Sequence, residues 1–181
     1  DNSDSTAFLS GTPTNDNVGD HAVVLLVTDN FGLTAEQSFT LSVANTNDAP
    51  VFTSTPTTSA VEDAGYSYTM VAEDIDVGDE LTYTAPSLPD WLTFDDSNTI
   101  SGTPLNADVG DHAVVLSVTD GEETVEQSFT ITVENTNDAP SADFIFLATD
   151  LVVTFTNASS DIDGDTLSSN WDFGDGSPKD T

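Results

Sequence analysis

Two short acidic loops contain the residue types whose spacing could do chemistry in this chain. In each loop carboxylates alternate with other residues, and a glycine permits the backbone to curl so that several carboxylates face one point. Calcium is a hard cation that takes about six to eight oxygen ligands. The loops therefore predict calcium binding. The carboxylates are those of Asp74, Asp76 and Asp79 in the first loop and of Asp161, Asp163 and Asp165 in the second.

A repeated hexapeptide, Asn-Thr-Asn-Asp-Ala-Pro, precedes each loop at residues 45–50 and 135–140. It is rich in side-chain oxygens, and its terminal proline is typical of a hinge between modules. We therefore expect one calcium ion at each of these two junctions, bound by residues from both sides. The first ion would take Asn47, Asp48, Glu62 or Asp63, Asp74 and Asp76, and the second would take Asn137, Asp138, Asp161 and Asp163. The turn residues Asp29 and Asp120 are further candidate ligands.

The overall charge supports this hypothesis. The chain has 33 acidic residues and a single basic one, Lys179, which gives a net charge of −32. Such charge repels itself unless cations screen or bind the carboxylates. The alternative interpretation is that these aspartates only cap turns and solvate a surface, which Asp does well. The charge excludes nucleic acid and anionic membrane surfaces as partners, because both require Lys and Arg.

Other chemistry has little support in the sequence. His21 and His112 are repeat-equivalent, and we expect both to be surface residues at strand starts, because no Cys or second His lies at ligand spacing. No nucleophile motif is present, so the chain is predicted not to be an enzyme. Trp91 and Trp171 could stack on sugars, but their positions within hydrophobic strand patterns favour a core role.

An internal repeat predicts the domains that would position the two acidic loops. The string Val-Gly-Asp-His-Ala-Val-Val-Leu occurs at 18–25 and again at 109–116, which gives a period of about ninety residues. Residues 1–49 match only the second half of this period. We therefore expect a C-terminal half-domain at 1–49, a complete domain at 50–139 and the N-terminal part of a different domain at 140–181.

Alternation of apolar and polar residues predicts short strands and no helix. Residues 53–59 are expected to be a solvated lead-in strand or an O-glycosylation tract. The predicted fold class is all-β, with tandem immunoglobulin- or cadherin-like β-sandwiches that are partial at both ends. The predicted strands are 66–71, 81–84, 91–94, 99–101, 112–118 and 128–133 in the complete domain, with 143–146 and 151–155 after it.

Five ordered motifs in residues 1–140 resemble the dystroglycan-type cadherin-like (He-PIG) repeat. They are Glu62-Asp63, Asp74–Leu81, Leu88–Leu92, Ser101–Pro104 and Asn137–Pro140. From residue 141 the chain resembles the start of a polycystic-kidney-disease-type (PKD) domain, whose marker is Trp171–Gly176. The resemblance implies extracellular sandwiches strung in long arrays, with calcium between successive domains. The junction departs from the cadherin pattern, because it has fewer carboxylates.

The expected function is therefore that of a structural and adhesive segment of a large extracellular tandem-repeat protein, such as an adhesin stalk or fibre. The expected partners are neighbouring repeats of the same long chain or copies in a head-to-tail homopolymer, and also glycans or polysaccharide. Membrane insertion of this segment is not expected. The alternative is a carbohydrate-binding accessory module of a secreted polysaccharide-degrading enzyme.

Overall fold

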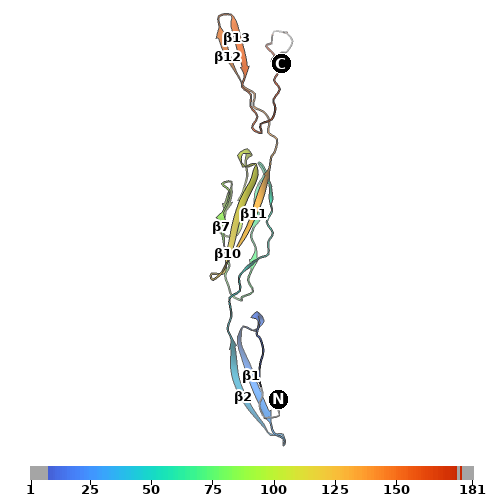
Figure 1. Ribbon diagram of the computed structural model, residues 1–181, viewed down its shortest axis with the longest axis vertical. Coiled ribbons are helices and arrows are strands. Elements are labelled where there is room, and N and C mark those ends of the chain that lie inside the picture. Colours follow the sequence, from blue (N-terminus) through green and yellow to red (C-terminus); the bar gives the residue numbers. More distant parts are fainter. Residues whose placement is uncertain (1–7, 175, 177–181) are drawn as a thin grey trace.

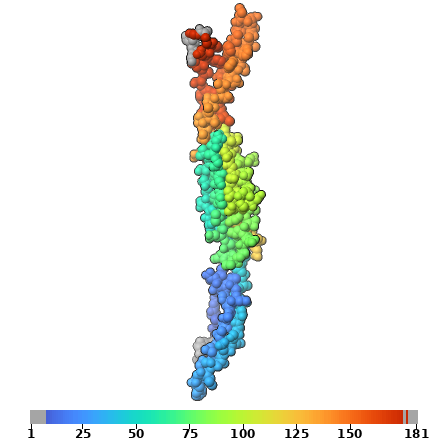
Figure 2. Space-filling view, turned by 180° about the vertical axis from the view of Figure 1, so that it is seen from behind, coloured from blue at the N-terminus to red at the C-terminus, as the bar shows by residue number. Residues whose placement is uncertain are grey.

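Three β-rich units follow one another along a slender rod (Figure 1). The computed structural model describes residues 8–174 and 176. Asp175 of the PKD-type marker and the basic residue Lys179 therefore lie outside the described residues. Within the described part, the helical segments are two 3-10 turns, η1 (Asn15–Asn17) and η2 (Asn106–Asp108). The space-filling view shows the units stacked end to end (Figure 2).

The first unit is a long antiparallel hairpin. Strand β1 (Gly19–Thr28) pairs with β2 (Thr34–Val43) over its whole length. The polypeptide turns at one end of this hairpin and leaves β2 at the other end, where it enters the first junction. Apolar side chains on one face of the hairpin stay exposed, among them Leu25 and Leu41 at 45% each. A second sheet does not cover this face within the described residues.

The middle unit is a complete sandwich built from nine strands. One sheet has the order β4-β11-β10-β7, the facing sheet has the order β5-β9-β8, and β3 pairs with β6. Strand β4 pairs with β11 in parallel, whereas the other pairs are antiparallel. The strands are β3 (Val51–Phe52), β4 (Ser59–Val61), β5 (Tyr66–Thr69), β6 (Ala72–Glu73), β7 (Thr82–Ser87), β8 (Leu92–Phe94), β9 (Thr99–Gly102), β10 (Gly110–Thr119) and β11 (Thr124–Glu134).

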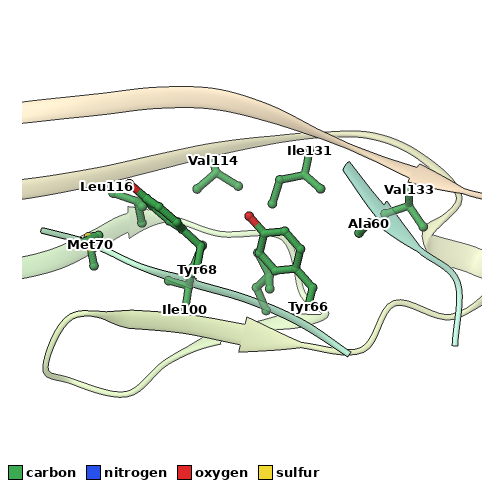
Figure 3. Packing of buried hydrophobic residues seen from close by; sticks show 10 residues of the cluster. Ala60, Tyr66, Tyr68, Met70, Ile100, Val114, Leu116, Ile131 and Val133 are labelled. Atoms are coloured by element: carbon green, nitrogen blue, oxygen red, sulfur yellow. The ribbon is translucent and has the colours of Figure 1, made fainter. Parts of the chain in front are cut away.

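The core lies between the two sheets of the middle unit (Figure 3). Alternate residues point inward, so that Tyr66 and Tyr68 of β5 face Leu116 of β10 and Ile131 of β11. Both tyrosines are buried. The Tyr66 hydroxyl donates to the Thr57 carbonyl at 2.7 Å. Burial, assisted by Tyr68, raises the pKa of Tyr66 to about 12.

The third unit is another hairpin, formed by β12 (Phe144–Thr149) and β13 (Val152–Asn157). Its aromatic side chains contact one another, and Trp171 lies 5.9 Å from both Phe144 and Phe155 between ring centres. Phe144 remains 51% exposed. The prediction of an all-β chain with immunoglobulin- or cadherin-like sandwich sheets is therefore confirmed.

Most strands of the middle unit were predicted, and three short ones were missed. All eight predicted strands are present, with ends that differ by a few residues. The lead-in strand predicted at 53–59 is wrong for residues 53–58, which form no strand, and β4 begins only at Ser59. The missed strands β3, β4 and β6 contain two or three residues each, whereas the equally short β8 is marked by the large apolar residues Trp91, Leu92 and Phe94.

Candidate metal centres at the two joints

The first candidate centre lies where the first unit meets the middle unit. Here the linker residue Asp48 donates its backbone N–H to Asp76 Oδ2 at 2.7 Å. The backbone N–H of Asp76 in turn donates to Asp74 Oδ1 at 2.8 Å, which curls the loop. Carboxylate oxygens of Asp74, Asp76 and Asp79 lie within 4.8 Å of one another. The three carboxylates of the predicted loop are thus brought together beside the linker.

The environment of this cluster favours a bound cation. Asp76 is only 5% exposed, and Asp74 Oδ2 is buried without a hydrogen-bond partner. Desolvation raises the pKa of Asp79, and the charges of Asp74, Asp76 and Asp120 raise it further. The described residues contain no Lys or Arg that could compensate these charges. Hard oxygen ligands without a basic partner fit calcium, so the donor set passes this chemical test.

Asp120 also lies at the first joint. It occupies the turn between β10 and β11, and its Oδ2 accepts a hydrogen bond from the Asn47 amide at 3.0 Å. Hydrogen bonds hold the pKa of Asp120 below its ordinary value, chiefly that from the Glu123 backbone N–H and then that from Asn47. Asp29 occupies the equivalent turn of the first unit, which lies at the end of the β1–β2 hairpin away from this joint.

The second candidate centre repeats this geometry between the middle and third units. The linker residue Asp138 donates its backbone N–H to Asp163 Oδ2 at 2.6 Å. The Asp163 N–H donates to Asp161 Oδ1 at 2.9 Å. Oxygens of Asp161, Asp163 and Asp165 lie within 4.8 Å of one another. The linker amide of Asn137 is 3.0 Å from the Asp138 carbonyl, as that of Asn47 is 3.3 Å from the Asp48 carbonyl.

Glu62 and Asp63 lie at the second joint, so the expectation that they serve the first joint is wrong. Glu62 is 3% exposed, and its carboxylate forms a second cluster with Asp138 and Asp163. Its Oε2 accepts the Thr136 N–H at 3.1 Å. The reason is the parallel pairing of β4 with β11, which delivers the residue after β4 to the end of β11. The adjacent Asp63 is exposed.

Two asparagines complete the joints and were missed by the sequence analysis. The Asn15 amide nitrogen lies 2.9 Å from Asp48 Oδ2 and 3.2 Å from Asp76 Oδ1. The Asn106 amide nitrogen lies 2.8 Å from Asp163 Oδ1. A signal was present, because each follows a Gly-Thr-Pro triplet at the same place in the repeat.

The histidines and tryptophans lie away from these carboxylates. His21 and His112 each donate from Nε2 to a backbone carbonyl of the preceding 3-10 turn, at 2.6 Å. Trp91 packs edge-on against Tyr66 with ring centres 5.7 Å apart, and against His112 at 5.9 Å. It is half-buried against the core, as favoured from the sequence. Trp171 borders a hollow of about 400 Å³ in the third unit, and sugar contact there stays the less favoured alternative to a core role.

The fold and the two joints define a class, that of tandem immunoglobulin-like sandwiches with acidic joints. Residues 49–134 match the family model described as "Putative Ig domain". The serine-rich adhesin for platelets of Staphylococcus aureus strain USA300 is 32% identical over 120 residues, which cover 66% of this chain. The chain spans about 5% of the length of that relative.

Partial matches among solved structures come from several kinds of protein. Human protocadherin-24 EC1-2 is 22% identical, with a TM-score of 0.39 over 61% of this chain and 62% of that one. The endo-fucoidan hydrolase MfFcnA4 of glycoside hydrolase family 107 is 26% identical, with a TM-score of 0.41 over 90% of this chain and 28% of that one. Among the described residues, no helix is long and apolar enough to cross a membrane.

Proposed function

We propose that this chain is a structural and adhesive segment of a large extracellular tandem-repeat protein, and that calcium stiffens its joints. The similarity to a staphylococcal adhesin supports an adhesive and non-enzymatic role at the cell surface. One observation carries the calcium part. At both joints the same loop aspartate, Asp76 or Asp163, accepts the N–H of the linker aspartate within a cluster of carboxylates. The uncovered faces of the outer units would pack against neighbouring repeats or head-to-tail copies.

The residues that would hold the ion come from the linker and the middle unit at the first joint, and from both units and the linker at the second. At the first joint Asp74, Asp76 and Asp79 form the cluster, with Asn47, Asp48 and Asp120 beside it. At the second joint Glu62 comes from the upstream unit, Asn137 and Asp138 come from the linker, and Asp161, Asp163 and Asp165 come from the third unit. Calcium would supply positive charge that these carboxylates otherwise lack, and so would join two units by one set of ligands. Without it, the carboxylates repel one another and the joint should loosen.

The test is small-angle scattering of the chain in excess calcium and in excess chelator, together with calorimetric titration of calcium. We expect an extended particle with a narrow range of shapes in calcium, and one with a wider range of shapes in chelator. The matched variant Asp76→Asn/Asp163→Asn should behave like the chelated chain in both solutions. Unchanged scattering together with no heat of calcium binding would overturn the proposal.

A further inference from the structure

Both joints contain a contact that needs no metal ion. Asn15 opens η1 and Asn106 opens η2, so each belongs to the unit upstream of its joint. The amide of Asn15 reaches Asp76, and that of Asn106 reaches Asp163, both in the loop of the next unit. The units after the two joints differ in sequence and strand pattern. Because the contact is nevertheless the same, it is a property of the joint.

Each asparagine is presented by a braced turn. In η1 the Asn17 Oδ1 accepts the Thr14 N–H at 3.0 Å, and in η2 the Asp108 Oδ2 accepts the Leu105 N–H at 2.9 Å. His21 and His112, near the start of the following strand, each donate a hydrogen bond to the last carbonyl of the turn. The turn is therefore held at both of its ends, which limits the positions that the asparagine can take.

The chemistry of an amide suits this place. The Asp76 carboxylate is almost fully buried, and both its oxygens accept hydrogen bonds from neutral donors, the Asn15 amide and the Asp48 N–H. Neutral donors satisfy a buried carboxylate without requiring a counter-charge. The Asn15 amide also bonds to Asp48, so a single side chain draws two like charges toward itself. Since the described residues contain no Lys or Arg, an amide is well placed to do this.

We propose that Asn15 and Asn106 are latches that bind each unit to the aspartate loop of the next unit, whether or not a cation is present. The partner surface of each 3-10 turn is thus the acidic loop of the following unit. Calcium and the latch have different tasks, because the ion neutralises the carboxylates, whereas the amide fixes the direction in which the next unit leaves. The latch goes beyond the calcium function and does not depend on it.

The chain has no cysteine, so two spin labels can be attached at a pair of introduced cysteines without labelling any native residue. Labels at the exposed, repeat-equivalent positions Thr40 and Thr130 report on the first joint, and labels at Thr130 and Thr154 report on the second. The measurement is the width of the distance distribution between labels, in chelator and in calcium. The melting temperature of the middle unit verifies that each variant is folded.

In chelator we expect the double variant N15A/N106A to widen both distributions at least about twofold relative to the unchanged chain, because a hydrogen bond across each joint is lost. The variant N15D/N106D should widen both distributions more in chelator, because it adds like charge at each joint. In calcium the distributions of this variant should become narrow again. The control N45D/N135D adds the same charge at exposed linker positions that make no comparable contact, and should leave the widths nearly unchanged.

Two results would overturn the latch. The first is that, in chelator, the N15A/N106A variant and the unchanged chain give distance distributions of equal width. The second is that the unchanged chain in chelator already gives the broad distributions of fully disordered joints. A failure of the calcium proposal looks different, because the unchanged chain would then give the same widths with and without calcium.

Discussion

Glu62 is a carboxylate that folding removes almost completely from water. It is 3% exposed, it lies within 4.8 Å of two other carboxylates, and its hydrogen bond from the Thr136 N–H satisfies only one of its oxygens. Burial of an unpaired charge is costly, and like charges nearby add to the cost. We therefore expect Glu62 to serve as a ligand of the proposed calcium ion at the second joint.

Glu62→Gln should change stability in opposite directions under two conditions. In chelator the variant should unfold at higher urea than the unchanged chain, because a neutral amide relieves repulsion and can still accept from Thr136. In excess calcium it should be less stable, by about 1.4 kcal/mol if its calcium affinity falls tenfold. Urea unfolding measures both. The exposed Glu126→Gln on β11 is the control, and a Glu62→Gln effect of the same sign in both solutions would contradict the explanation.

The candidate ligands could be read from the sequence only where spacing alone sets their position. Asp74, Asp76 and Asp79 cluster because they share one short loop, and no distant pairing is needed. Glu62 was assigned to the wrong joint, because its place depends on a parallel pairing with β11 that local patterns do not reveal. Asn106 was overlooked because an amide in a short turn looks like a cap until its partner is known.

At the scale of elements, the close approach of β8 and β9 limits what the fold tolerates. A Cβ atom built on Gly102 would lie 1.9 Å from the backbone oxygen of Trp91, just before β8. A backbone oxygen cannot swing aside as a side chain can. The strands would have to separate, and the packing of Leu92 and Ile100 in the core would be disturbed.

Gly102→Ala should therefore cost about 3 kcal/mol or more of unfolding free energy. The control is Gly65→Ala, because a Cβ there meets nothing within 4 Å and the backbone is not left-handed. Chemical denaturation of the two variants gives the comparison. Equal stability of both would show that β8 and β9 separate easily, contrary to the packing described above.

Elements with a long alternating pattern were predictable, and elements defined by a distant partner were not. Strand β11 stands out because less exposed and exposed residues alternate along its eleven residues, and β10 stands out because its ten residues include four of the strand formers Val and Thr. Strand β4 has three residues, and it exists because Thr132, Val133 and Glu134 provide a parallel edge. The prediction of sandwich layers therefore came from long strands such as β10 and β11. The position of Glu62 at the second joint depends instead on the short strand β4.

For the whole molecule, the question is whether its charge is screened or specifically bound. At about 0.5 M sodium chloride the screening length falls below about 5 Å, yet buried charges are screened much less than exposed ones. Asp76 and Glu62 are both buried. We therefore expect sodium chloride in chelator to raise the melting temperature far less than millimolar calcium does. An equal rise from both salts, measured by calorimetry, would favour general screening over defined ions.

The parallel pair of β4 and β11 has a mechanical consequence. The chain leaves the middle unit directly from β11, so tension applied along the rod pulls on that strand along its own length. Its three register pairs with β4, from Thr132↔Ser59 to Glu134↔Val61, lie side by side along the line of pull. The backbone hydrogen bonds between β4 and β11 are therefore loaded in shear and must break together. A hairpin that is pulled open from its end instead loses its hydrogen bonds one after another. The same pairing that carries Glu62 to the joint thus places a shear clamp at the point where load enters the domain.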